Sequence, residues 1–180
     1  MIDQFPTIET KRFILRQFKA DDLENVYKGL SNPEVIKYYG VSYETLQATQ
    51  EQLNWFVSLE RENKGIWWAI SSKDDNSFCG AGGLNDLSSA NRKAEIGLWL
   101  LPDYWGKDIM REVLPRIVEH GFEKLNLHRI EGYVDSKNTN CKNALAKLDF
   151  NHEGTMVDCE FKDGKYISLD IYAMINRYGN

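Results

Sequence analysis

The residues best suited to chemistry in this sequence lie in the loop Tyr104-Trp105-Gly106-Lys107-Asp108-Ile109, which opens a predicted helix. The first N–H groups of a helix have no partner within the helix, and together with the helix dipole they favour a bound anion such as a phosphate. Gly106 lets the backbone come close to such a ligand, and Lys107 adds a positive charge. An ordinary helix start often has the same composition, so this loop alone does not define a site.

Other kinds of site are not indicated. Neither the GxxxxGK[ST] phosphate loop nor the GxGxxG dinucleotide motif occurs in the chain. His120, His128 and His152 do not have metal-ligand spacing with one another or with the cysteines. We therefore expect no metal.

The elements around the loop must position it. Apolar runs predict strands over residues 94–101 and 129–134, with a helix over 107–124 between them. A parallel crossover of this kind is the one place in the chain where a bound anion can meet a helix N-terminus next to strand ends.

The rest of the chain predicts further strands and helices in a regular order. Strands are expected over 12–16, 66–71, 77–84, 156–161 and 166–174, and helices over 21–29, 43–63 and 140–148. This order predicts an α/β (α+β) domain with one central βαβ unit. The length of 180 residues and the absence of a linker predict a single domain over 1–180.

Composition excludes several function classes. Hydrophobic residues make up 42% of the chain, which is enough for a folded core. The net charge is 22 − 27 = −5, so a basic surface for nucleic acid is not expected. No apolar run approaches the ~20 residues of a membrane span. Cys79, Cys141 and Cys159 are odd in number and scattered, which suggests reduced thiols and a cytoplasmic location.

Several stretches together resemble one enzyme family. The run Ala94–Met110 resembles the acetyl-CoA motif of GNAT N-acetyltransferases, most closely the RimJ/RimL-like branch. Ile8–Arg16 looks like that branch's "TxRLxLR" opening strand, and Asn138–Phe150 resembles its "NxxS…KLGF" segment. Gly121-Phe122, Leu127–Ile130 and His152-Glu153-Gly154 are also similar to the family, and all of these stretches occur in the family's order.

The resemblance implies a fold and a cofactor site. The fold would be a GNAT-type mixed, mostly antiparallel sheet of six to seven strands, with a splayed central parallel pair and about four helices. Acetyl-CoA would be the co-substrate, with no metal. The backbone of Leu98, Trp99 and Leu100 would contact its pantetheine arm. Its pyrophosphate would be held by Trp105, Gly106, Lys107, Asp108, Ile109 and Met110. Asn138, Asn143 and Lys147 would lie along the cofactor.

The family's loop is roughly Q/R-x-x-G-x-G/A, and this chain has Trp105, Asp108 and Met110 at the three defined positions. Trp105 and Met110 are tolerable because the contacts are mostly made by backbone, whereas Asp108 takes the place of a glycine. Its carboxylate would stand beside a pyrophosphate. At about 5 Å, repulsion is roughly 1 kcal/mol per charge pair in water and about 3 kcal/mol at an effective dielectric constant of 20. Asp108 pointing to solvent is the alternative. We expect weakened binding of acetyl-CoA.

The resemblance also bears on the acid and base of the transfer. In many family members a Tyr acts as the acid at the position where this chain has Leu145. RimL-like members have a Ser at the position where this chain has Cys141. A thiol donates only weakly. Glu95 and Glu160 are the base candidates, and the resemblance places Glu160 where a carboxylate can face the acceptor.

The sequence therefore predicts an acetyl-CoA-dependent N-acetyltransferase that works by direct attack of an amine in a ternary complex. A site with a poor base favours an amine of low pKa, such as a protein N-terminal α-amine. A small amine such as an antibiotic or a polyamine is an alternative acceptor, and a non-catalytic acyl-CoA-binding module is an alternative from another class. Family analogy suggests a homodimer, and no nucleic acid or membrane partner is expected.

Overall fold

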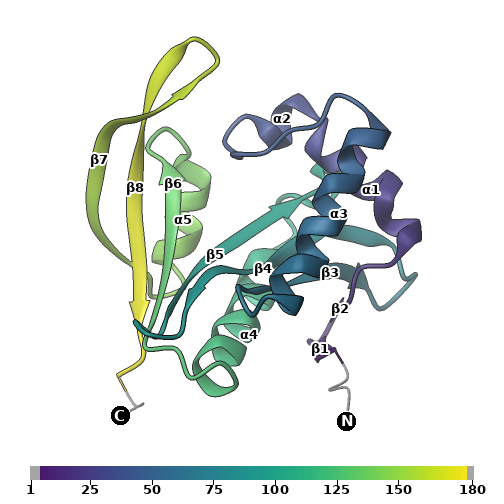
Figure 1. Ribbon diagram of the computed structural model, residues 1–180, viewed down its shortest axis with the longest axis horizontal. Coiled ribbons are helices and arrows are strands. Elements are labelled where there is room, and N and C mark those ends of the chain that lie inside the picture. Colours follow the sequence, from purple (N-terminus) through teal and green to yellow (C-terminus); the bar gives the residue numbers. More distant parts are fainter. Residues whose placement is uncertain (1–4, 178–180) are drawn as a thin grey trace.

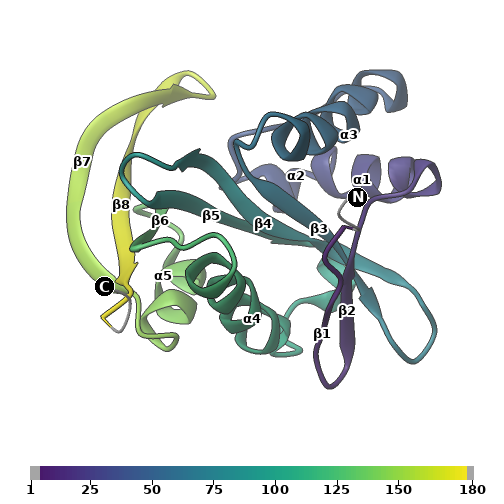
Figure 2. The ribbon, with the colours of Figure 1, turned by 60° about the horizontal axis from the view of Figure 1, so that its bottom comes forward.

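The computed structural model describes residues 5–177 and has a twisted sheet with helices on both faces (Figures 1 and 2). The strands are β1 (Ile8–Glu9), β2 (Phe13–Arg16), β3 (Ile66–Ser72), β4 (Phe78–Ser88), β5 (Lys93–Leu100), β6 (Arg129–Asp135), β7 (Asn151–Lys162) and β8 (Lys165–Ile175). The α-helices are α1 (Leu23–Leu30), α2 (Pro33–Ile36), α3 (Leu46–Arg61), α4 (Ile109–Glu123) and α5 (Thr139–Ala146). The ends of the predicted domain, 1–4 and 178–180, lie outside the described residues.

The strands form one sheet in the order β1-β2-β3-β4-β5-β6-β8-β7. Every neighbouring pair is antiparallel except β5 and β6, which are parallel. The mixed, mostly antiparallel sheet with a central parallel pair is therefore confirmed. The described chain has more elements than expected because β1 extends one edge and α2 adds a single turn after Asn32, whose side chain accepts from the Glu34 N–H.

The parallel pair separates after three residues. Lys93, Ala94 and Glu95 pair with Arg129, Ile130 and Glu131, and no pairing between β5 and β6 follows. β5 nevertheless continues to Leu100 and stays paired with β4 along that length. Backbone groups alternate in direction along a strand, so those that β5 directs toward β6 beyond Glu95 have no strand partner. This is the splay that the family resemblance implied.

Each face of the sheet carries its own hydrophobic core. One core packs α4 against the sheet through residues such as Ile96, Val113 and Ile117, and the other packs α1 and α3 through residues such as Phe56 and Trp99. Side chains alternate along β5, so Ile96 belongs to the first core, whereas Glu95 points to the same side as Trp99. Figure 2 shows α4 and α5 on one side of the sheet and α1–α3 on the other.

The β7–β8 hairpin extends beyond the helices and forms a separate wall at the left of Figure 1. The side chains of β7 are mostly exposed, unlike those of the central strand β3, whereas β8 contributes buried residues such as Ile167 and Tyr172. Within residues 5–177, no helix combines the length and apolar character needed to cross a membrane.

Candidate functional site

The loop before α4 is open to solvent and fixed at its ends. Ile109 is buried and anchors the first turn of the helix, while the indole N–H of Trp105 donates to the Leu100 carbonyl at 2.9 Å. Gly106 has a φ of 72°, and a Cβ atom added there would meet no atom within 4 Å. Lys107 is exposed, with its ammonium 5.2 Å from the centre of the Tyr104 ring. The loop therefore leaves space beside the N–H groups of the first turn.

Asp108 takes the position just before α4 in a left-handed conformation, with φ 57° and ψ 24°. A glycine adopts this conformation without cost, and Asp is among the few other residues that tolerate it. The predicted helix over 107–124 therefore begins only at Ile109. The Asp108 side chain makes no capping hydrogen bond. The first N–H groups of α4 thus stay available for an anion, and a carboxylate lies on the same turn.

The residues predicted to follow the cofactor along α5 are spread over its full length. Asn138 caps its start and accepts from the Cys141 N–H at 3.1 Å. Asn143 is exposed on the helix, and Lys147 is exposed just past its end. Lys147 there lines a cavity of about 620 Å³ with residues from the second half of α4, such as Phe122. The helix separates Asn138 from Lys147, so the two cannot contact the same part of a ligand.

The acid candidate on α5 is poorly suited to its role. Burial raises the pKa of the Cys141 thiol to about 11. Such a thiol stays protonated at neutral pH and gives up its proton reluctantly. Leu145, where the family often has a tyrosine, is buried and apolar.

Glu95 is the last residue of β5 that pairs with β6, and the two strands separate after it. Burial is the main cause that raises the pKa of its carboxyl to about 7, followed by the charges of Asp86, Glu131 and Glu160 and by a hydrogen bond with Asp86. A carboxyl with this pKa is about half ionised at neutral pH and can accept a proton there.

Irregularities in two strands help to bring the acidic side chains together. The register of β4 against β5 shifts between Asn85 and Ser88, and Asp86 within it has a φ of 49°. The register of β7 shifts between Met156 and Glu160. A bulge of this kind bends a strand and redirects its side chains. Carboxylates from β4, β6 and β7 consequently raise the pKa of Glu95 on β5.

Glu131 pairs with Glu95 in the sheet, but its pKa is lowered whereas that of Glu95 is raised. Lys93 contacts its carboxylate at 2.7 Å and Arg129 at 2.6 Å. Burial tends to raise the pKa of Glu131, yet its hydrogen bonds to these two cations outweigh burial and lower it. Glu131 therefore remains ionised, and also accepts a hydrogen bond from the Tyr133 hydroxyl at 3.2 Å.

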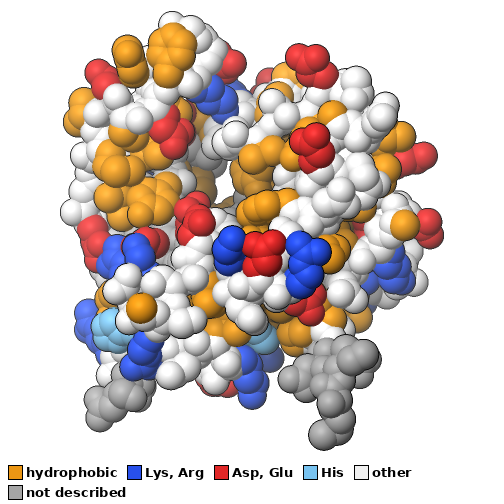
Figure 3. Space-filling model, viewed as in Figure 1, with side chains coloured by type: hydrophobic (Ala, Val, Ile, Leu, Met, Phe, Trp, Pro, Cys, Tyr) orange, Lys and Arg blue, Asp and Glu red, His pale blue; other side chains and the backbone are white. Residues whose placement is uncertain are grey.

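The space over Glu95 is walled by the hairpin on one side and by the helical layer on the other. Tyr39, in the loop after α2, lies close enough that its pKa is raised by burial and also by the charge of Glu95. Its hydroxyl thus stays protonated. Figure 3 shows a hollow between the two halves of the molecule, with apolar side chains on both walls.

Sequence reasoning found part of this group. The structure brings Glu95 and Glu160 to the same place, whereas Asp86, Glu131 and Tyr39 were missed. Glu131 could have been found, because the predicted strands 94–101 and 129–134 are parallel and begin together. Asp86 could not, since its position depends on the bulge in β4.

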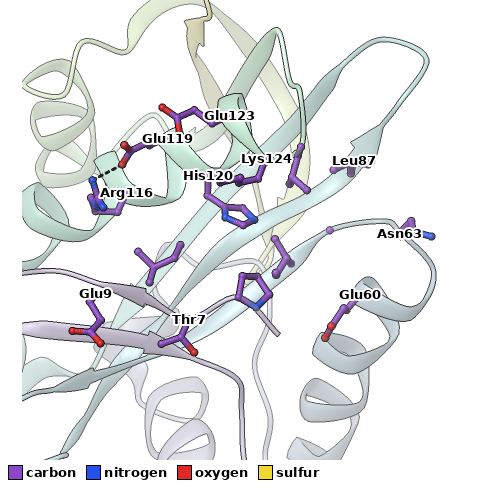
Figure 4. A pocket seen from close by; sticks show the side chains of 15 residues that line it. Thr7, Glu9, Glu60, Asn63, Leu87, Arg116, Glu119, His120, Glu123 and Lys124 are labelled. Carbon is purple, nitrogen blue, oxygen red and sulfur yellow. Dashed lines mark ion pairs between the residues drawn. The ribbon is translucent and has the colours of Figure 1, made fainter. Parts of the chain in front are cut away.

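A second cavity, of about 660 Å³, lies between β1, the end of α3 and α4 (Figure 4). His120 points into it, and Arg116 pairs there with Glu119. None of the predicted site residues lines this cavity. Among the described residues, no group of three or more His, Cys, Asp or Glu is arranged to hold a metal ion.

The backbone groups at the gap between β5 and β6 fit the chemical groups of a coenzyme A thioester. An extended amide-containing arm can pair with the backbone groups of β5 that lack a strand partner. A pyrophosphate can accept from the N–H groups that begin α4, where Gly106 leaves open space.

Comparisons with known proteins agree with this geometry. Residues 12–151 match the family model described as an acetyltransferase (GNAT) domain. YoaA, an uncharacterized N-acetyltransferase of Bacillus subtilis (strain 168), is 32% identical over 95% of this chain and 97% of its own. Spermidine N(1)-acetyltransferase of Vibrio cholerae is 24% identical over 92% of this chain and 95% of its own. A solved structure of RimL, a ribosomal L7/L12 alpha-N-protein acetyltransferase in complex with coenzyme A, has a TM-score of 0.85 at 20% identity and covers 94% of this chain and 98% of that chain.

The family match covers most of the chain, including β5, the loop before α4, β6 and α5. The chain therefore belongs to the GNAT acetyltransferase family, and it is an N-acetyltransferase that takes its acetyl group from acetyl-CoA.

Proposed function

We propose that the chain acetylates a small amine that carries two or more positive charges, such as a polyamine, with Glu95 as the general base. The observation that supports this acceptor class is the set of carboxylates that act together where β5 leaves β6. The sequence alone put a protein N-terminal α-amine first, on the condition that the base is poor. Glu95, with a pKa of about 7, is a good base at neutral pH, so the reason to prefer an α-amine no longer applies.

The charge balance of the cleft favours a cation. Within residues 5–177, no Lys or Arg forms an ion pair with Asp86, Glu95 or Glu160. An ammonium about 6 Å from one carboxylate gains about 3 kcal/mol at an effective dielectric constant of 20. A second ammonium on the same acceptor can gain a similar amount from a different carboxylate. A cleft of this kind therefore distinguishes diamines from monoamines.

The same charges make a base necessary. Negative neighbours stabilise the ammonium form of the acceptor, but only the neutral amine can attack the thioester. An amine with a pKa near 10 is about one part in 10³ neutral at pH 7. Glu95 removes the proton within the cleft, and its raised pKa suits it to this task because a carboxylate with an ordinary pKa would be a weaker base.

The donor side of the proposal uses the backbone. The backbone groups of Leu98 and Leu100 face the gap and hold the pantetheine arm, whereas those of Trp99, although predicted to contribute, face β4. The N–H groups after Asp108 hold the pyrophosphate. Acetyl-CoA supplies the thioester carbonyl, and an N–H of β5 in the gap stabilises the negative charge that develops on its oxygen. Because Cys141 is a poor acid, solvent protonates the leaving sulfur.

The relatives support an amine acceptor and include one that acts on spermidine. A protein N-terminal α-amine, the acceptor of the RimL neighbour, is the competing proposal. The homodimer suggested by family analogy stays a prediction.

The acceptor class is tested with two amines that differ in one charge. We expect kcat/KM for 1,4-diaminobutane to exceed that for 1-aminobutane by at least tenfold, because the second ammonium meets a second carboxylate. Release of coenzyme A and the mass of the acetylated product measure the rate. The ratio should shrink as salt is raised. Equal rates for the two amines, or faster acetylation of a peptide N-terminus without cationic side chains, would contradict the proposal.

Glu95→Gln tests the base. We expect kcat/KM for 1,4-diaminobutane to fall by about 10²–10⁴-fold, since general bases contribute that much. In the wild-type enzyme the rate should rise as Glu95 ionises and level off above a pH of about 7, and the variant should lack this inflection. Glu123→Gln, on the exposed end of α4, is the control that keeps the wild-type profile. A normal rate in Glu95→Gln would assign the base elsewhere.

The same variant should change stability with pH. The folded pKa of Glu95 is about 7 against an ordinary value of 4.5, so the folded state holds the proton more tightly than the unfolded state. The contribution of Glu95 to the stability of the folded state is fully present below pH 4.5 and is lost as pH rises through 7. Glu95→Gln should therefore raise the free energy of unfolding by about 2–3 kcal/mol at pH 8 and leave it unchanged at pH 4.5. Denaturant titrations at the two pH values measure this, and an equal effect at both would show that burial does not disfavour the charge.

Asp108 should weaken cofactor binding through its charge. Asp108→Asn keeps a residue that tolerates the left-handed backbone, and we expect it to bind coenzyme A about fivefold more tightly at low salt, which corresponds to roughly 1 kcal/mol. Calorimetry measures the affinity. Asp149→Asn is a matched control, because Asp149 is also left-handed, with a φ of 62°, and lies outside the loop before α4. Equal affinities for wild type and Asp108→Asn would mean that the carboxylate points away from the pyrophosphate.

A further inference from the structure

Lys162, at the end of β7, makes an unusual set of contacts across the molecule. Its ammonium donates to the carbonyls of Ile36 at 2.7 Å, Lys37 at 3.0 Å and Tyr39 at 2.9 Å. An ammonium has three N–H donors, so all of them are used. The partners are 123–126 residues away in sequence and lie at the end of α2 and in the loop that follows.

These contacts join the two walls of the acceptor cleft. On one side, Glu160 and Lys162 lie two residues apart on β7 and therefore on the same face of the strand. Glu160 acts on Glu95, so this face is directed toward the cleft. On the other side, the loop that accepts from Lys162 carries Tyr39, whose phenol is close to Glu95.

The hairpin has little else to fix its position at this end. Phe161 and Tyr166 contact each other with ring centres 5.2 Å apart, but they are 67% and 65% exposed. Among the described residues, the three hydrogen bonds from Lys162 to backbone carbonyls thus attach the end of the hairpin to the loop after α2.

We propose that Lys162 is a positioning residue for the acceptor: it ties the β7–β8 hairpin to the loop after α2 and so closes the cleft around Glu95, which admits slender amines and excludes bulky ones. The proposal rests on the acceptor site proposed above. With the tie in place, the cleft is bounded by the hairpin, the sheet, the helical layer and the ammonium with its carbonyls. An acceptor must enter end-on between these walls. The amine is thereby held toward Glu95, so the tie affects binding of the acceptor more than the chemical step.

Lys162→Met removes the three donors and keeps most of the aliphatic stem. Lys165→Met is the matched control, because Lys165 pairs with Lys162 across the same turn, is exposed and carries the same charge. Loss of a positive charge near the cleft would by itself lower KM for a cationic acceptor. A rise in KM in Lys162→Met therefore reports the lost tie and not the lost charge.

We expect KM for 1,4-diaminobutane to rise at least fivefold in Lys162→Met, with kcat within threefold of wild type. The preference for this diamine over a peptide N-terminus, as a ratio of kcat/KM, should fall at least fivefold. Backbone amides of residues 37–45 should exchange hydrogen faster than in wild type. Lys165→Met should match wild type in KM, kcat, acceptor preference and amide exchange.

An unchanged or lowered KM with unchanged amide exchange would overturn the role of Lys162 while leaving the proposed function intact. Failure of the wild-type enzyme to acetylate 1,4-diaminobutane, 1-aminobutane or the peptide N-terminus would instead reject the proposed function. In that case, unchanged amide exchange in Lys162→Met would also reject the tie itself.

Discussion

The whole site depends on the separation of two parallel strands after three paired residues. Hydrogen bonds between β5 and β6 end at the pair Glu95–Glu131, yet β5 is held on its other edge by β4 up to Leu100. Among the described residues, the backbone groups of β5 that face the gap beyond Glu95 have no strand partner, although the Leu100 carbonyl accepts from the Trp105 indole. The separation therefore leaves room, and backbone donors and acceptors, for an extended ligand. It also places Glu95 at the point where the gap begins, with its side chain on the face opposite α4.

Two carboxylates at this point show how one sheet can set different protonation states. Glu95 and Glu131 are neighbours in register, and burial tends to raise the pKa of both. Among the residues that the structure describes, Lys93 and Arg129 contact Glu131 and no cation contacts Glu95, so the two cations reverse the effect of burial at Glu131 alone. Glu131 then acts as a fixed negative charge that helps to keep the pKa of Glu95 high. Environments that push the pKa values of two neighbouring groups apart are typical of sites that move protons.

Sequence reasoning worked where apolar periodicity or a motif within one stretch of chain carries the signal, and it failed at one local backbone conformation and at contacts between distant segments. Apolar periodicity located the central strands and α4, and the family motif located the loop at Gly106 because one stretch of chain carries it. The start of α4 was placed too early, since the left-handed conformation of Asp108 is not visible in its residue type. Asp86 reaches Glu95 only through a bulge in β4. Lys162 contacts backbone carbonyls, so no residue type at Ile36, Lys37 or Tyr39 could have indicated the contact.

The two halves of the site differ in how firmly the fold supports them. The donor side is built on β5 and on α4, whose Val113 and Ile117 are fully buried, so its geometry is set by close packing. The proposed acceptor side is bounded in part by the hairpin, whose outer strand β7 has mostly exposed side chains, such as Val157 at 75%. Loosely packed elements open at lower free energy than the core. For the proposed site we therefore expect the cleft to change width on the acceptor side while the donor side keeps its shape, an arrangement suited to an enzyme family that keeps one donor and varies its acceptors.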